Sequence, residues 1–204
     1  AVNSGYKKQG LRVNLDHVLS SRVSLTVSTN VLHTNSDRAL SNNDNSGTSP
    51  GAVLAFTPSF FDPRKKNGVY PTNPFERSNP LQTLNLITNT EDVWRALGTV
   101  TARVALLTGE TQRLNVTAIG GADFFSQRND FLSPPQLQYE PNDQQPGTVV
   151  LGKANNLNTN FALNAAHNYT PVSKAFDATT SFGVQYEDRE LNATSVVGRT
   201  LVAG

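Results

Sequence analysis

Apolar and polar residues alternate along six stretches of the chain. Residues 11–16 read Leu-Arg-Val-Asn-Leu-Asp, and residues 157–164 read Leu-Asn-Thr-Asn-Phe-Ala-Leu-Asn. Successive side chains of a strand point to opposite faces, so such a pattern gives each strand one apolar and one polar face. The alternation predicts strands near residues 6–18, 22–34, 92–107, 112–127, 156–169 and 175–190.

The connections between these strands are alternately short and long. Tight turns are expected at Ser20-Ser21, at Thr108-Gly109-Glu110 and at Pro171, whereas irregular Asn/Ser/Pro/Gly-rich stretches run from about Thr34 to Asn89 and from about Ser126 to Asn155. Outer-membrane barrels have short periplasmic turns and long extracellular loops. We therefore expect an all-β fold of antiparallel up-and-down strands, forming a partial transmembrane β-barrel with that loop arrangement.

Aromatic residues lie at the ends of the predicted apolar faces. Trp94 and Tyr186 are expected near the long-loop end, and Tyr169 and Phe176 near the short-turn end. Rings at both ends are typical of the aromatic girdles of a membrane barrel. A wet lumen would suit the Asn, Thr and Ser residues of the opposite face.

Two segments allow another interpretation. Thr90 could cap a short helix that ends at Gly98, although the continuing alternation favours a strand. The tail, Asn192 to Gly204, could begin a further strand.

The composition excludes several classes of protein. The chain is 37% hydrophobic and 16% charged, with a net charge of +1, which excludes a highly charged disordered chain and gives no field for nucleic acid. It has no apolar run near the roughly 20 residues of a membrane helix. The absence of cysteine excludes disulfides and thiolate sites. The basic run Arg64-Lys65-Lys66 is expected to be a solvated loop rather than a phosphate site.

No residue pattern indicates catalysis, and we expect that the chain is not an enzyme. His17, His33 and His167 fall toward strand ends and belong to no hydrolase or metal motif. Asp123 and Glu187 are isolated carboxylates. The segment Asn42 to Gly47 faintly resembles a calcium loop, but Val53 stands where a glutamate ligand is needed. No catalytic, cofactor or metal residues are therefore assigned, and no cofactor is expected.

Several segments resemble the SusC/RagA family of TonB-dependent outer-membrane transporters. They are Gly5-Tyr6-Lys7-Lys8, Leu11 to Leu15, Asn67-Gly68-Val69-Tyr70-Pro71, Asn73-Pro74-Phe75 and Ser78-Asn79-Pro80-Leu81. The resemblance implies that residues 1–204 are one segment of a larger barrel domain in the bacterial outer membrane, with plug, signal peptide and C-terminal strand outside the segment. It further implies import of oligosaccharides, peptides or similar nutrients, with outer-membrane lipid, a SusD-like surface lipoprotein and the TonB complex as partners.

Aromatic residues crowd the first long loop: Phe56, Phe60, Phe61, Tyr70 and Phe75. They could form a small core that holds the loop together. Alternatively, Phe60, Phe61, Tyr70 and Phe75 could contact substrate or the covering lipoprotein, because exposed rings are common anchors.

The competing function is a soluble or surface binding module, a lectin-like or adhesin-like β-sandwich. In that fold the apolar faces would cover each other in a dry core, whereas in a barrel they would face lipid.

Overall fold

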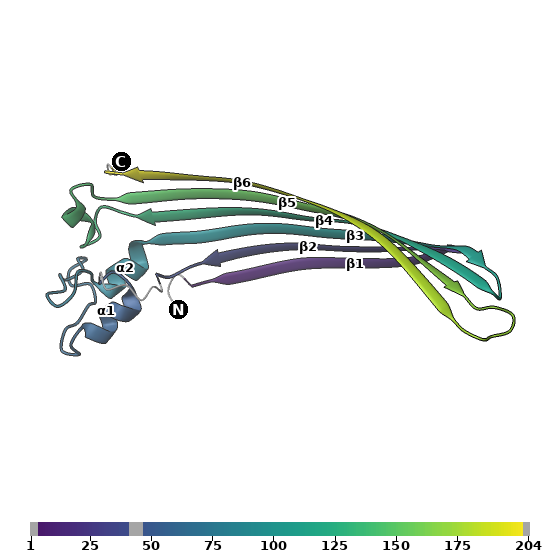
Figure 1. Cartoon of the computed structure of the whole chain (residues 1–204). Helices are drawn as coiled ribbons and strands as arrows, with labels where there is room; N and C mark the ends of the chain where they lie inside the picture. Colours follow the sequence, from purple (N-terminus) through teal and green to yellow (C-terminus); the bar gives the residue numbers. More distant parts are fainter. Residues whose placement is uncertain (1–3, 41–46, 202–204) are drawn as a thin grey trace.

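The computed structural model describes residues 4–40 and 47–201, in which six antiparallel strands form one sheet (Figure 1). The strands follow the chain order, so each one pairs with its neighbour in sequence. Their bounds are β1 Tyr6–Ser20, β2 Val23–Asp37, β3 Thr88–Thr108, β4 Gln112–Ser133, β5 Thr148–Tyr169 and β6 Ala178–Arg199. The sheet is open, with β1 and β6 as its edges, and the expected all-β up-and-down arrangement is confirmed.

The four later strands are longer than the alternation predicted, and the difference lies mainly at the long-loop end. β3 begins at Thr88 instead of 92, β4 ends at Ser133 instead of 127, and β5 begins at Thr148 instead of 156. The extensions mix polar and apolar residues on both faces, as in Val149-Val150-Leu151, and so lack alternation. Their backbones still pair in register, as in Leu132↔Val149. Alternation is visible only in the part of a strand that has one apolar and one polar face.

Two further expectations are corrected and one is confirmed. The second long loop is residues 134–147, much shorter than the stretch from Ser126 to Asn155. The segment from Thr90 to Gly98 is strand, as the alternation favoured, and not the alternative short helix. The tail from Asn192 continues β6 as far as Arg199 instead of beginning another strand.

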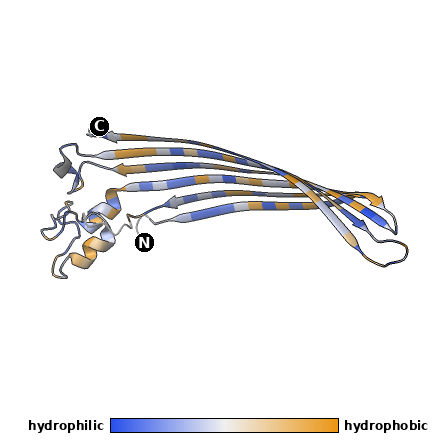
Figure 2. Cartoon of the chain, in the orientation of Figure 1, coloured by the Kyte–Doolittle hydropathy of each residue, from blue (hydrophilic) through white to orange (hydrophobic). Residues whose placement is uncertain are grey.

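The register places most apolar residues of the six strands on one face, which we call the apolar face. One row across the sheet reads Leu15, Val27, Val100, Gly120, Phe161 and Tyr186. Many of these side chains are exposed, including Leu15 at 55% and Tyr186 at 64%. Figure 2 shows the resulting apolar and polar segments along the strands. No second layer covers this face among the described residues.

The apolar band ends unevenly on the side of the long loops. On β1 it reaches Leu11, but on β6 it stops at Tyr186, because Asp188 is the next residue on that face. Tyr186 lies in the row of Leu15, so the edge moves by four positions (15 − 11) between the two strands. The row of Leu11 is apolar across the first five strands, through Val31, Ala96, Phe124 and Leu157, and only on β6 does a charged residue, Glu190, stand in it. Tyr186 therefore lies at the end of the apolar face, as expected, but not near the long-loop end, because β6 continues to Arg199.

The connections differ at the two ends of the sheet. Residues 21–22, 109–111 and 170–177 join strands at one end, where Tyr169 and Phe176 lie with ring centroids 6.0 Å apart. Both longer loops lie at the other end, with the helices α1 Pro50–Phe56 and α2 Pro80–Leu86 and the 3₁₀ turn η1 Glu140–Asp143 (Figure 1). No helix in the described part of the chain is long and apolar enough to cross a membrane.

Candidate functional site

The two long loops pack together into one unit, the loop assembly, made of residues 38–40, 47–87 and 134–147. Its helix α2 begins at a strong sequence signal, Asn79-Pro80, because asparagine is a favoured N-cap and proline suits the first helical position. The Asn79 Oδ1 accepts hydrogen bonds from the backbone of Leu81 at 3.0 Å and of Gln82 at 3.2 Å. Its Nδ2 donates to the carbonyls of Pro63 and Pro71, both at 2.9 Å. The fully buried Asn79 thus ties three parts of the loop together.

Side-chain amides also join the first loop to the second. The Gln138 Nε2 donates to the Pro71 carbonyl at 3.0 Å, and the Gln138 Oε1 accepts from the Asn73 backbone at 3.2 Å. Gln82, on α2, donates to the Gln136 carbonyl at 2.9 Å. Buried amides with satisfied partners fix a geometry, because breaking one such bond leaves a desolvated polar group. The two loops are therefore held as one body.

A small apolar cluster places this assembly over the polar face of the sheet. Ile87, Leu137 and Tyr139 are buried, and Phe131 packs against them from the polar face of β4. Arg38, just beyond β2, donates to Asn129 at 2.6 Å on the same face and also forms an ion pair with Glu91. The assembly consequently lies over the polar face and leaves the apolar face uncovered.

Of the four aromatic residues proposed as contacts, the structure brings three together. Phe75 meets Phe60 edge-on, with ring centroids 5.6 Å apart, and Phe61 at 6.4 Å. Tyr70 lies under the Lys65 ammonium, 4.8 Å from the ring centroid. Phe60 is 80% exposed and Phe56 72% exposed, so these two rings do not form a loop core. Polar residues such as Asn73 and Asn79 occupy the interior instead.

The basic run beside these rings is partly neutralised. The Arg64 Nε donates to the Asp62 Oδ1 at 2.9 Å, and a terminal nitrogen donates to the Oδ2 at 3.1 Å. These hydrogen bonds lower the pKa of the Asp62 carboxyl and raise the pKa of the Arg64 guanidinium. Arg64 is thus committed to its neighbour.

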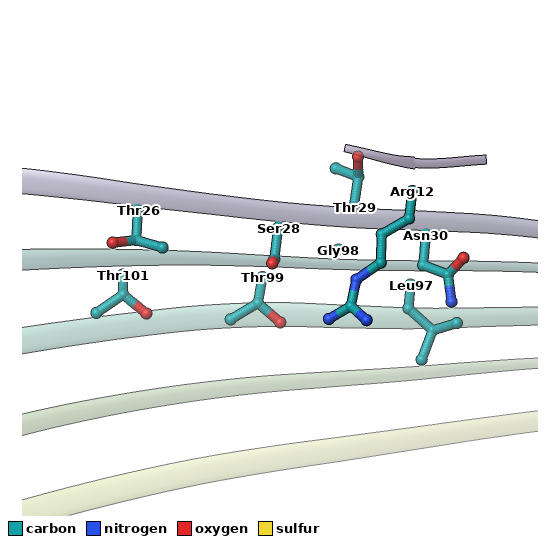
Figure 3. A pocket seen from close by; sticks show the side chains of 9 residues that line it. All are labelled: Arg12, Thr26, Ser28, Thr29, Asn30, Leu97, Gly98, Thr99 and Thr101. Carbon is teal, nitrogen blue, oxygen red and sulfur yellow. The ribbon is translucent and has the colours of Figure 1, made fainter. Parts of the chain in front are cut away.

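The polar face of the sheet carries hydroxyl and amide side chains with paired charges. Arg95 and Asp123 form an ion pair between β3 and β4, with the Nε 2.9 Å from the carboxylate. Thr26 donates to Asp16 at 2.7 Å. A shallow hollow of about 470 Å³ lies there, and Figure 3 shows Arg12 reaching into it from β1. Its other lining residues include Thr26, Ser28, Asn30, Leu97, Thr99 and Thr101.

The histidines and carboxylates considered for chemistry lie in separate settings. The His33 Nε2 lies 2.7 Å from the Asp92 carboxylate, and the His33 ring stacks on Trp94 at 4.1 Å. Glu187 pairs with Arg189 on β6, and its row lies two positions from that of Asp123 on β4. The two carboxylates line one shallow hollow of the polar face from strands separated by β5, so they are less isolated than expected. No group of three potential metal ligands occurs among the described residues. The possible calcium loop at Asn42 lies largely outside them.

Sequence reasoning missed the amide network and the contact between the loops. The Asn79-Pro80 capping signal could have revealed the start of α2. Gln82 and Gln138 are 56 residues apart, and nothing local to either one indicates that they meet.

No protein-family model matches the chain. No curated protein is similar to it either. Among solved structures, it is similar to a chain of the RagAB peptide importer in the "closed-closed" state, with a TM-score of 0.71 and 16% sequence identity. The match covers 96% of this chain but 22% of that one, so the chain spans about a fifth of its structural neighbour. At this identity the likeness concerns the fold.

Proposed function

We propose that this chain is part of the wall of a bacterial outer-membrane transporter of the SusC/RagA, TonB-dependent kind, which imports oligosaccharides, peptides or similar nutrients. The observation that carries the proposal is the division of the sheet into two faces. One face bears a continuous, exposed apolar band, and the other bears hydroxyl, amide and paired charged groups. Lipid against the first face and water against the second would satisfy both.

The strands and their connections support the same assignment. Strands of 21–22 residues exceed the roughly 9–11 residues that a tilted strand needs to cross hydrocarbon. Both edges of the sheet are exposed, as expected where further strands would continue a barrel. A β-sandwich module would need a second sheet over the apolar face, and the described residues form only one. The similarity to RagAB agrees with a barrel wall.

The loop assembly suggests how such a wall would meet its partners. It is held by buried amides at the end of the sheet that would be extracellular, over the polar face that would line the lumen. Phe60, Phe61 and Phe75 form an exposed aromatic cluster on it, with Tyr70 and its lysine nearby in sequence. We assign these four residues to contact with substrate or with a SusD-like surface lipoprotein. Energy from the TonB complex would reach the intact protein, and the chain itself would catalyse no reaction.

The two faces can be tested with single cysteines, because the chain contains none. Spin labels at Val100→Cys and Leu163→Cys should collide with oxygen dissolved in the bilayer when the intact protein, otherwise free of cysteine, is reconstituted. Labels at the adjacent Thr101→Cys and Asn164→Cys should be protected from it. Equal oxygen accessibility at adjacent positions would contradict a membrane-spanning wall.

A further inference from the structure

The apolar face changes character at the edge of its band on β4 and β5. Phe124 and Leu157 are paired and form the last apolar row before a polar stretch, and the next fully apolar pair on this face of the two strands is Leu132 and Val149. The row directly after Phe124 and Leu157 is Ser126 and Asn155, joined by a hydrogen bond of 2.8 Å between their side chains. The row after it pairs Arg128 with Lys153. Arg128 is four positions along the strand from Phe124, so the two cations lie roughly 13 Å beyond the row of Phe124.

Two like charges directly opposite each other on one face of a sheet are unfavourable. Asp130 holds Arg128 through the Nε at 3.1 Å, which leaves the terminal guanidinium nitrogens available. Lys153 is exposed and makes no ion pair among the described residues. Asp92 lies directly opposite Arg128 on β3, in the same row and on the same face, and it also bonds His33. Arg128 thus has a carboxylate on two sides, and Lys153 is the cation whose charge a bound anion would neutralise.

We propose that Arg128 and Lys153 bind the phosphate of an anionic lipid headgroup, an inference that rests on the membrane location proposed above. The guanidinium can donate two parallel hydrogen bonds to phosphate, and the ammonium adds a point charge. The Ser126–Asn155 pair lies between this site and the apolar band, at the depth of the polar glycerol region. The acyl chains then lie along Phe124 and Leu157, and the site holds one lipid against the outside of the wall.

The position of the cations favours lipid over other anions. Arg128 and Lys153 share a face with Phe124 and Leu157, so they point away from the lumen and its solutes. On the opposite face Arg95 is already paired with Asp123. Interfacial basic residues just beyond an apolar span attract anionic headgroups, by a factor of about five for each residue.

Binding of phosphatidylglycerol to the intact protein in detergent micelles tests the site, with phosphatidylcholine as the neutral reference. The double variant Arg128→Gln/Lys153→Gln should bind phosphatidylglycerol about 30-fold more weakly than the unchanged protein. The matched control, Arg12→Gln/Arg103→Gln, removes two cations from the polar face. Its affinity for phosphatidylglycerol should stay within about twofold of that of the unchanged protein.

Several outcomes would overturn the proposal. Equal affinity of the double variant and the unchanged protein would exclude the site. Displacement of the lipid by millimolar inorganic phosphate would show a site for free phosphate instead of a headgroup. Flotation with liposomes separates these results from failure of the proposed function. A protein that does not float at all would contradict the membrane location itself. A protein that floats without preference for phosphatidylglycerol would contradict only the lipid site.

Discussion

At the scale of single residues, neighbours in one strand meet opposite surroundings. Leu163 faces the band with Ala118 and Val184 beside it, whereas Asn164 lies on the polar face, where its carboxamide covers Gly183. A Cβ at Gly183 would come within 2.6 Å of the Asn164 Oδ1, so the Asn164 amide can lie over this position only because residue 183 is glycine. The consequences of substitution should therefore differ sharply between adjacent positions.

We expect Leu163→Arg to destabilise the intact barrel by about 2–4 kcal/mol, the usual cost of a cation at the lipid-facing midplane. Val104→Arg should behave similarly. Thr101→Arg and Asn164→Arg serve as matched controls on the polar face and should cost about 1 kcal/mol or less. Refolding titrations in lipid vesicles measure the differences, and equal costs on both faces would argue against a membrane wall.

Asn79 is the residue on which the first loop depends most. Asn79→Ala removes the helix cap, worth about 1 kcal/mol, and leaves the buried carbonyls of Pro63 and Pro71 without their donor, at roughly 1–3 kcal/mol in addition. Asn79→Ser retains a capping oxygen but cannot donate to either carbonyl. It should therefore recover only the stabilisation that comes from the helix cap. Cleavage of the loop by proteinase K in the intact protein is the measurement. Unchanged cleavage of the alanine variant would show that the network is not what orders the loop.

At the scale of elements, sequence patterns located the strands but not their full lengths. The period-two pattern in residues 157–164 is clear because one face of β5 there is apolar. From Thr148 to Asn156 the same strand carries Lys153 and Asn155 on the face that is apolar from Leu157 onward. The alternation therefore disappears there, although backbone pairing continues. Both helices were missed because each has only seven residues, too few for helical periodicity to show.

The aromatic loop residues illustrate a second limit of sequence reasoning. Their density in the first loop indicated something unusual, and the structure does bring Phe60, Phe61 and Phe75 together. Whether a ring is interior or exposed depends on which other groups fill the loop, here Asn73, Asn79 and partners from another loop. Such contacts between distant segments leave no local pattern.

The coupling of the loops gives a prediction at this scale. Gln138→Ala should free the Asn73 backbone and the Pro71 carbonyl, so that both loops open more often and amide hydrogen exchange rises about 30-fold in each, corresponding to about 2 kcal/mol. Gln136→Ala, in the same loop, is the matched control because only its backbone carbonyl is used. Faster exchange confined to residues 134–147 would mean that the loops move independently.

At the scale of the whole molecule, an open sheet with an uncovered apolar face is unsuited to water. Exposed residues on that face include Leu15, Val100, Phe161, Phe182, Val184 and Tyr186. All fifteen residues of β1 are exposed, so one edge presents unpaired backbone groups along its length. The buried apolar residues lie in the loop assembly and its junction with the sheet, which gives the strands no core of their own.

We expect residues 1–204, produced alone without detergent, to associate instead of forming a stable monomer. The exposed band exceeds the few hundred Å² of apolar patch that soluble monomers tolerate, and the strand edges can recruit other chains. Light scattering with denaturant unfolding tests this expectation. A monodisperse monomer with a cooperative transition would contradict the barrel assignment and favour the binding module.

The sequential order of the strands has a consequence for how the sheet assembles in time. Every strand pairs only with its neighbours along the chain, so the hairpins β1–β2, β3–β4 and β5–β6 can each form after closing a connection of a few residues. Joining β2 to β3 requires closure across residues 38–87. Compared with a two-residue turn, that costs roughly 3 kcal/mol more in chain entropy. Early condensation of the loop around Asn79 would shorten the effective span, so the same amide that orders the mature loop would also accelerate the slowest pairing step.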